Sequence, residues 1–216
     1  MAEVLREAIL RNVLTGGQQL RQDEIAAHLG VSRIPVREAL RQLEAEGLVT
    51  FFPHRGAVVS ELSHQEVQEI YEIRIPLEAT ALRLALPRLT QQDLERAEAI
   101  LEAIDRETEV AKWSGLNREF HTILYTPADR PRLLALINTL RTNVERYQRI
   151  YISLMQHKVN SQREHRQILE ACRRRDVGTA VQALESHLGQ AAQELVAYLR
   201  DGRDRRLRTE AKPAPR

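Results

Sequence analysis

Residues 22–46 read QDEIAAHLGVSRIPVREALRQLEAE and predict two short helices joined at Gly30. The second helix begins at Ser32, which favours the N-cap position, and Pro35 falls in the first turn, where its missing N–H costs little. Four apolar residues recur at helical spacing and are predicted to face a small core: Val36, Ala39, Leu40 and Leu43.

Another face of the second helix is cationic. Its three arginines step by four residues and form one stripe: Arg33, Arg37 and Arg41. A helix that is apolar inward and arginine-lined outward suits the DNA major groove, where Arg donates bidentately to guanine and pairs with phosphates. The alternative is a solvated surface helix, because Glu38 and Glu44 lie on it too.

A β-hairpin is predicted directly after this helix. Residues 48–52 and 57–60 are β-prone, and a turn with basic residues separates them: Pro53, His54, Arg55 and Gly56. A hairpin beside a recognition helix is a wing, whose tip can reach a phosphate or the minor groove. An ordinary surface turn is the commoner meaning of one hairpin, but helix, turn, arginine-striped helix and hairpin together are a rarer combination.

Residues 20–59 resemble the winged helix-turn-helix of GntR-family bacterial transcription regulators. The block VSRIPVREAL at 31–40, continued by LEAEGLV at 43–49, follows the family signature almost residue for residue. The resemblance implies that Arg33 and Arg37 contact operator DNA, with Gly56 and its neighbours in the wing. Asp23 stands where some members have a DNA-contacting arginine, so their operator sequence cannot be transferred to this chain.

Composition narrows the remaining choices. The chain has 216 residues, room for two small domains, and only 4% aromatics, which favours helices. No apolar run approaches a membrane span and no secretory leader is recognisable, so we expect a cytoplasmic protein. The single cysteine, Cys172, excludes an internal disulfide and is predicted to be an inert thiol on a helix face.

Bulk charge does not carry the DNA interpretation. Residues 1–62 hold seven Lys/Arg against eight Asp/Glu, whereas residues 200–216 hold seven against three. That basic C-terminal tail has no apolar periodicity and is predicted to be disordered. The DNA interpretation therefore rests on local arrangement.

From Ser63 onward the pattern is helical, and the predicted fold class is mainly α: a winged helix-turn-helix followed by an all-α antiparallel bundle. Ser63 and Glu66 have capping-box spacing. Six helices are predicted, at about 63–86, 91–110, 112–125, 130–154, 160–174 and 177–200. We therefore predict a DNA-binding domain at 1–62, an effector-binding and dimerisation domain at 63–200, and the tail at 201–216.

Three histidines are predicted to point into this bundle. His121 lies on the third of its helices, His165 on the fifth and His187 in an apolar stripe of the sixth, while Asn117 precedes His121 by one turn. Any one of them alone is better explained as a core histidine bonded to a carbonyl. Three together, with an amide oxygen nearby, favour a shared divalent metal ion, most simply Zn²⁺, with Ni²⁺ or a similar ion as the alternative.

Residues 63–200 resemble the C-terminal effector domain of the FadR-type branch of the same family, in its six-helix, VanR-like variant. The landmarks are YEIR at 71–74, LNREFH at 116–121, EH at 164–165 and His187. Many members bind metal with one Asp and three His; here Asn117 stands at the Asp position, which lowers the expected affinity. The resemblance implies a small organic acid that completes the metal's shell. Arg74 is a candidate partner for its carboxylate, and an i,i+4 pair with Glu78 is the equal alternative.

Three functions fit these features. The one we predict is a ligand-responsive transcription regulator, a homodimer in which the pocket sets the spacing or mobility of two DNA-reading heads. A metalloenzyme is the second, because three protein ligands with open positions are also a catalytic zinc pattern. Against it, Glu119 and Glu164 are predicted to point about 100° away from the neighbouring histidines, which leaves no general base. The third is a constitutive architectural DNA-binding protein with structural histidines.

Overall fold

A computed structural model describes the backbone of residues 1–155 and 158–210 and, within them, the side chains of residues 1–149 and 160–201. The chain forms two compact units. Met1–Glu61 and Asn138–Arg149 make up the first, and Leu62–Ile137 and the chain from Ile150 onward make up the second. Among the described helices, none is both long and apolar enough to cross a membrane.

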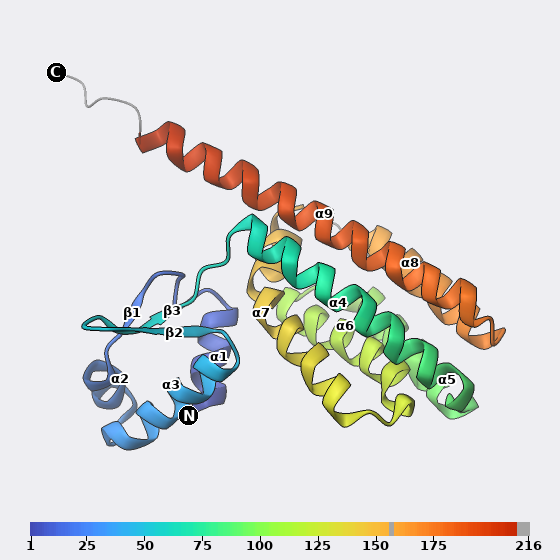
Figure 1. Cartoon of the computed structure of the whole chain (residues 1–216), viewed down its shortest axis with the longest axis horizontal. Coiled ribbons are helices and arrows are strands. Elements are labelled where there is room, and N and C mark those ends of the chain that lie inside the picture. The colour runs from blue at the N-terminus through green and yellow to red at the C-terminus, as the bar shows by residue number, and fades with distance from the viewer. Residues whose placement is uncertain (156–157, 211–216) are drawn as a thin grey trace. The chain divides into compact units, whose positions relative to one another are not determined.

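The first unit is a small helical cluster with a three-stranded antiparallel sheet in the order β1-β3-β2 (Figure 1). Its elements are α1 (Ala2–Leu10), β1 (Gln19–Leu20), α2 (Gln22–Leu29), α3 (Arg33–Ala45), β2 (Val49–Phe52) and β3 (Gly56–Val59). This is the winged helix-turn-helix that the sequence predicts. The short strand β1 was not predicted, because two residues are too few to show a period-2 pattern.

Helix α3 buries the face that its sequence indicates. The four predicted core residues are at most 4% exposed: Val36, Ala39, Leu40 and Leu43. Gly30 ends α2 with φ +66°, a left-handed conformation that glycine adopts without strain. Ser32 is the N-cap residue of α3, as predicted, but its side chain makes no capping hydrogen bond.

The predicted hairpin is confirmed. Val49 pairs with Val59 and Phe52 with Gly56, so the strands meet in register up to the turn. At the tip, His54 has φ +63° and Gly56 has φ +70°, and these two left-handed residues reverse the chain. The turn residues that were predicted to reach DNA therefore lie at an exposed tip.

The second unit is helical throughout its described residues. Its elements are α4 (His64–Ala85), η1 (Leu86–Arg88), α5 (Gln91–Arg106), α6 (Val110–Tyr125), η2 (Thr126–Ala128), α8 (Lys158–Arg173), α9 (Val177–Glu210) and the two ends of α7 (Pro131–Met155), whose middle part belongs to the first unit. Two predicted boundaries are wrong. The second helix of the unit ends at Arg106 instead of residue 110, and α9 continues past residue 200 to Glu210, where we predicted a disordered tail. Residues 211–216 of that tail lie outside the described residues.

Local signals fix where these helices begin. Ser63 and Glu66 form the predicted capping box at the start of α4, and Asp176 accepts a hydrogen bond from the Thr179 amide at the start of α9. Cys172 is fully buried on α8, and burial raises the pKa of its thiol to about 12, so it is the inert thiol predicted from the sequence.

Candidate functional site

The helical unit brings together the three histidines that its sequence pattern singles out. His121 comes from α6, His165 from α8 and His187 from α9, and their exposed fractions are 2%, 0% and 7%. One ligand atom from each lies within 4.8 Å of the others. Their ring centroids are 4.6–5.5 Å apart. Three buried imidazoles from three helices therefore converge on one point.

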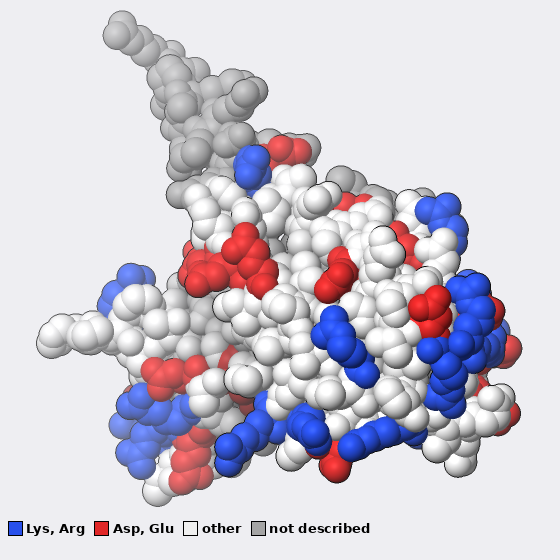
Figure 2. Space-filling model, turned by 45° about the vertical axis from the view of Figure 1, so that its right-hand side comes forward, with Lys and Arg blue, Asp and Glu red and all other residues white. Residues whose placement is uncertain are grey.

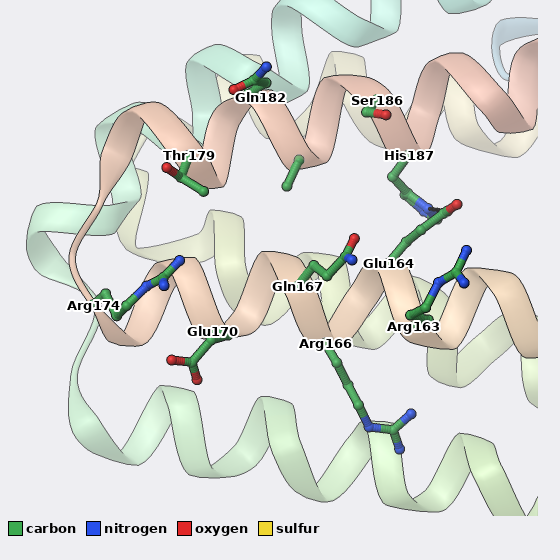
Figure 3. A pocket seen from close by; sticks show the side chains of 11 residues that line it. Arg163, Glu164, Arg166, Gln167, Glu170, Arg174, Thr179, Gln182, Ser186 and His187 are labelled. Atoms are coloured by element: carbon green, nitrogen blue, oxygen red, sulfur yellow. Dashed lines mark hydrogen bonds and ion pairs between the residues drawn. The ribbon is translucent and has the colours of Figure 1, made fainter.

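Glu164 holds the imidazole of His187. Its Oε2 lies 2.7 Å from His187 Nδ1, and Figure 3 shows the two side chains meeting between α8 and α9. A carboxylate only accepts, so His187 Nδ1 must carry a proton. We predicted that Glu164 points about 100° away from its sequence neighbour His165. It turns toward the facing helix and contacts His187, a histidine that the prediction did not consider.

Gln162 holds His165 in the same way. Its Oε1 lies 3.1 Å from His165 Nδ1. The amide orientation is fixed, since Gln162 Nε2 donates to the Leu101 carbonyl at 3.0 Å and to Asp105 at 2.7 Å. The Gln162 oxygen therefore faces the ring, and His165 Nδ1 is the donor. Sequence reasoning missed Gln162, because its partners lie about 60 residues away.

His121 is held through a chain of buried side chains. The Tyr125 hydroxyl donates to Glu78 at 2.8 Å and lies 3.2 Å from His121 Nδ1, so its oxygen accepts from the ring. Glu78 also pairs with Arg74 at 2.8 Å, the i,i+4 alternative raised from the sequence. Burial is the largest single influence on Arg74 and opposes its charge, but Glu78, Tyr71 and Tyr125 together outweigh it and raise the pKa of Arg74.

Fixing each Nδ1 as a donor makes each Nε2 an acceptor when the rings are neutral. Yet His165 Nε2 and His187 Nε2 face each other at 3.2 Å. Two lone pairs at this distance repel unless a proton or a metal ion lies between them. Two nitrogens bound tetrahedrally to one zinc, each about 2.0–2.1 Å from the ion, are roughly 3.3 Å apart. The observed separation fits that geometry.

Asn117 supplies a further acceptor. It lies on α6 one turn before His121, and its Oδ1 is buried without a hydrogen-bond partner in the described part of the chain. An unsatisfied buried acceptor costs free energy, and a cation would satisfy it. The residues present therefore fit a metal ion: imidazole nitrogens and an amide oxygen, with their orienting partners already in place.

A groove of about 850 Å³ runs between α8 and α9 and reaches this cluster (Figure 3). Glu164 and His187 line one part of it. The other charged residues that line the groove are Glu170 and three arginines: Arg163, Arg166 and Arg174. Glu164 therefore lines this groove and at the same time contacts the imidazole of His187.

The first unit presents the arginine stripe of α3. Arg33, Arg37 and Arg41 are all exposed. Arg33 forms an ion pair with Asp23 of α2, and Arg41 pairs with Glu44 at 2.8 Å. Basic and acidic side chains accordingly mix over this unit on the face shown in Figure 2.

The wing adds further exposed groups. At its tip are His54, Arg55 and Gly56, and the guanidinium of Arg55 lies 6.0 Å from the ring centroid of Phe52. Ser32 is exposed at the start of α3. The recognition helix and the wing thus both offer groups to a partner.

Comparison with known proteins identifies this arrangement. A model of bacterial regulatory proteins of the gntR family matches residues 1–59, and a model of the FCD domain matches residues 69–190. The Bacillus subtilis transcriptional regulator YdhC is 30% identical over 205 residues, which cover 93% of this chain and 91% of that protein. The chain belongs to the GntR family of transcription regulators. It has the FCD domain of the FadR-like branch.

Two further relatives agree with this assignment. The Escherichia coli HTH-type transcriptional repressor RspR is 27% identical, covering 89% of this chain and 86% of its own. A crystal structure of a GntR family member from Pseudomonas syringae is 40% identical, covers 94% of this chain and 86% of that chain, and superposes with a TM-score of 0.62. These relatives are transcription regulators and not enzymes, so the chain is a DNA-binding regulator and the metalloenzyme alternative is set aside.

Proposed function

We propose that the FCD domain of this regulator binds one divalent metal ion through His121, His165 and His187, with the Asn117 amide oxygen as a fourth ligand. Imidazole nitrogen suits Zn²⁺ best here, and Ni²⁺ is the closest alternative. The observation that carries the proposal is the pair of Nε2 atoms facing each other at 3.2 Å. When bound, the ion supplies positive charge and open coordination positions.

The proposed effector is a small organic acid. All four proposed ligands are neutral, so they cancel none of the ion's charge, and a buried charge favours an anionic partner. Arg74 supports this choice. Glu78 takes its Nε and Nη2, but Nη1 is buried and lacks a partner among the described residues. A carboxylate can accept from that donor.

The effector would act on operator binding by differential affinity. It changes the equilibrium only if it binds the DNA-competent and DNA-incompetent arrangements unequally. We assign operator recognition to exposed groups of residues 1–62: Ser32, Arg33, Arg37 and Arg41 on the recognition helix, and His54, Arg55 and Gly56 in the wing. Residues 63–200 would bind the effector and form the homodimer, residues 201–216 would be a basic extension, and the protein would act in the cytoplasm, on operator DNA.

Zinc binding tests the metal part of the proposal. Wild-type protein should bind one Zn²⁺ per chain in calorimetry, and elemental analysis should give the same ratio. His165→Ala should lose the metal and the response to acids while it retains operator affinity, because the DNA-reading residues belong to the other unit. His28→Ala, which removes an exposed histidine of α2, is the matched control. Undiminished zinc binding by His165→Ala would contradict the proposal.

Asn117 gives a test in the opposite direction. Asn117→Asp replaces a neutral oxygen ligand with an anionic one of the same size. It should tighten zinc binding, because the carboxylate adds charge attraction at the ion. Unchanged affinity in this variant would show that Asn117 is not a ligand, even if the three histidines are.

A further inference from the structure

Helix α6 carries two more buried polar atoms that no group of the described residues satisfies. These are Trp113 Nε1 and Ser114 Oγ, on side chains whose residues are 4% and 8% exposed. Neither atom has a hydrogen-bond partner in the part of the chain that the structure describes. Leaving a buried polar group unpaired is destabilising, so two such groups on neighbouring residues of the chain indicate a binding partner.

The chemistry of these two atoms defines what they can bind. An indole N–H only donates, and a hydroxyl donates through its one hydrogen. Each of them can therefore donate to an oxygen acceptor. They differ in this from Asn117 Oδ1 and the imidazole Nε2 atoms, which accept. Helix α6 therefore carries acceptors suited to a cation at Asn117 and His121, and donors suited to an oxygen-bearing ligand at Trp113 and Ser114.

The spacing of these segments follows from helix geometry. Trp113, Asn117 and His121 lie at intervals of four residues on α6, so they share one stripe of the helix. At 1.5 Å per residue, Trp113 and Ser114 precede His121 by about 10–12 Å along the axis. A zinc–oxygen bond of about 2 Å and a hydrogen bond of about 2.9 Å lie oblique to the axis. Taking about half of their combined length along the axis leaves roughly 8 Å between two ligand oxygens.

We propose that Trp113 and Ser114 form a second subsite for the effector, which binds an oxygen group at the end remote from the metal. This inference rests on the proposed function, since it takes the metal-bound carboxylate as the near end. The effector class is then an acid with two oxygen-bearing ends, such as a dicarboxylate. An extended chain advances about 1.2 Å per bond, so some six or seven bonds join the two oxygens. Adipate has about this length.

Three simple acids test the subsite by calorimetry on zinc-loaded protein. Adipate has both ends at the right separation, hexanoate has the same length without the second carboxylate, and succinate has both carboxylates too close together. Adipate should bind about ten- to a hundredfold more tightly than hexanoate, the range expected for hydrogen bonds to a charged group. It should also bind more tightly than succinate.

Two variants assign any preference to the subsite. Trp113→Phe keeps the apolar ring and removes the donor, and Ser114→Ala removes the hydroxyl. Each should bring the adipate affinity toward that of hexanoate, while hexanoate affinity, zinc content and melting temperature stay at wild-type values. Thr122→Ala, on the exposed side of α6, is the control and should keep the full preference for adipate.

The outcomes separate this inference from the function on which it rests. Zinc-dependent binding of hexanoate with no gain for adipate would overturn the second subsite and leave the metal-anchored effector in place. An adipate preference that survives both Trp113→Phe and Ser114→Ala would also overturn it. Failure of the zinc-loaded wild type to bind any of the three acids would contradict the proposed carboxylate effector, and the second subsite with it.

Discussion

Each histidine of the cluster is oriented by a different acceptor. His187 donates to a carboxylate, His165 to an amide oxygen and His121 to a tyrosine hydroxyl. All three bonds use Nδ1, so all three direct Nε2 inward. Such outer partners fix the tautomer and raise the basicity of the ligating nitrogen, most strongly when the acceptor is an anion. Glu164 should therefore have the largest influence of the three on a bound metal.

We expect Glu164→Gln to weaken zinc binding by roughly 10- to 100-fold, the range typical for outer partners of ligating histidines. The amide retains the size of the side chain but loses the charge that polarises His187. Competition with a chelating indicator measures the change. Glu170→Gln is the matched control, because Glu170 lines the same groove on the same helix. Equal zinc affinities in the two variants would remove the assigned role of Glu164.

The recognition helix permits a second test at a single residue. Arg37→Ala should lower operator affinity by about 1–3 kcal/mol if the guanidinium makes a bidentate base contact. The melting temperature should not change, because Arg37 is exposed. Arg96→Ala removes the same charge from α5 and controls for net charge. A variant that melts early, or that binds the operator normally, would contradict the assignment of Arg37.

The histidines also show where prediction from sequence stops. Helical periodicity is enough to place His121, His165 and His187 inside the bundle, because it reports which face of a helix is apolar. It does not report which residues of different helices meet. Gln162 and Glu164 were missed as partners for that reason, and Glu164 was judged only against its neighbours along the chain.

At the scale of helices and strands, the predictions that depended on residues close together in the sequence were the ones that the structure confirmed. The capping box at Ser63 and the apolar face of α3 depend on residues three to four positions apart, and both were predicted correctly. Strand β1 exists only because it pairs with β3, which lies nearly 40 residues further on, so its own two residues could not reveal it. The N-cap at Ser32 was placed correctly, but its hydrogen bond was not formed.

Helices α1 and α3 are joined by a partly buried ion pair with a testable pH dependence. Arg6 Nη2 lies 2.6 Å from Glu46 Oε1, and the hydrogen bond from Arg6 lowers the pKa of Glu46 below its usual value of 4.5. A lowered folded-state pKa means that the stabilisation is fully present above pH 4.5. It is lost as the pH falls through the folded-state pKa.

Glu46→Gln should therefore destabilise the α1–α3 contact by up to about 1 kcal/mol at pH 7. The difference from wild type should shrink below pH 4.5, because the wild-type carboxyl is then protonated as well. Hydrogen exchange of the α1 and α3 amides measures the opening free energy at each pH. Glu44→Gln, at a more exposed pair, serves as the control. A difference that stays constant down to pH 3 would show that Glu46 acts by packing and not by charge.

At the scale of the whole molecule, the chain combines a DNA-binding family domain with an FCD domain. One helix-turn-helix covers only half of a two-fold symmetric operator, and a dimer aligns two of them with half-sites one helical turn apart, about 34–36 Å. We therefore expect light scattering to give twice the 24.8 kDa of the chain. Because the dimer fixes the distance between its two DNA-binding domains, operator affinity should also depend on the spacing of the half-sites.

Operators with altered spacing test this directly. Inserting five base pairs between the half-sites turns the second site to the opposite face of the duplex, so a dimer can hold only one of them and affinity should fall sharply. Inserting ten base pairs restores the face but not the distance, and should recover part of the affinity only if the two heads are mobile. If the effector restricts that mobility, adding the acid should change the affinity for the operator with the ten-base-pair insertion by a different factor from the affinity for the native operator. If the affinity were the same for every spacing, each DNA-binding domain would bind its half-site independently. An effector in the helical domain could then not act by changing the spacing or mobility of the two DNA-binding domains.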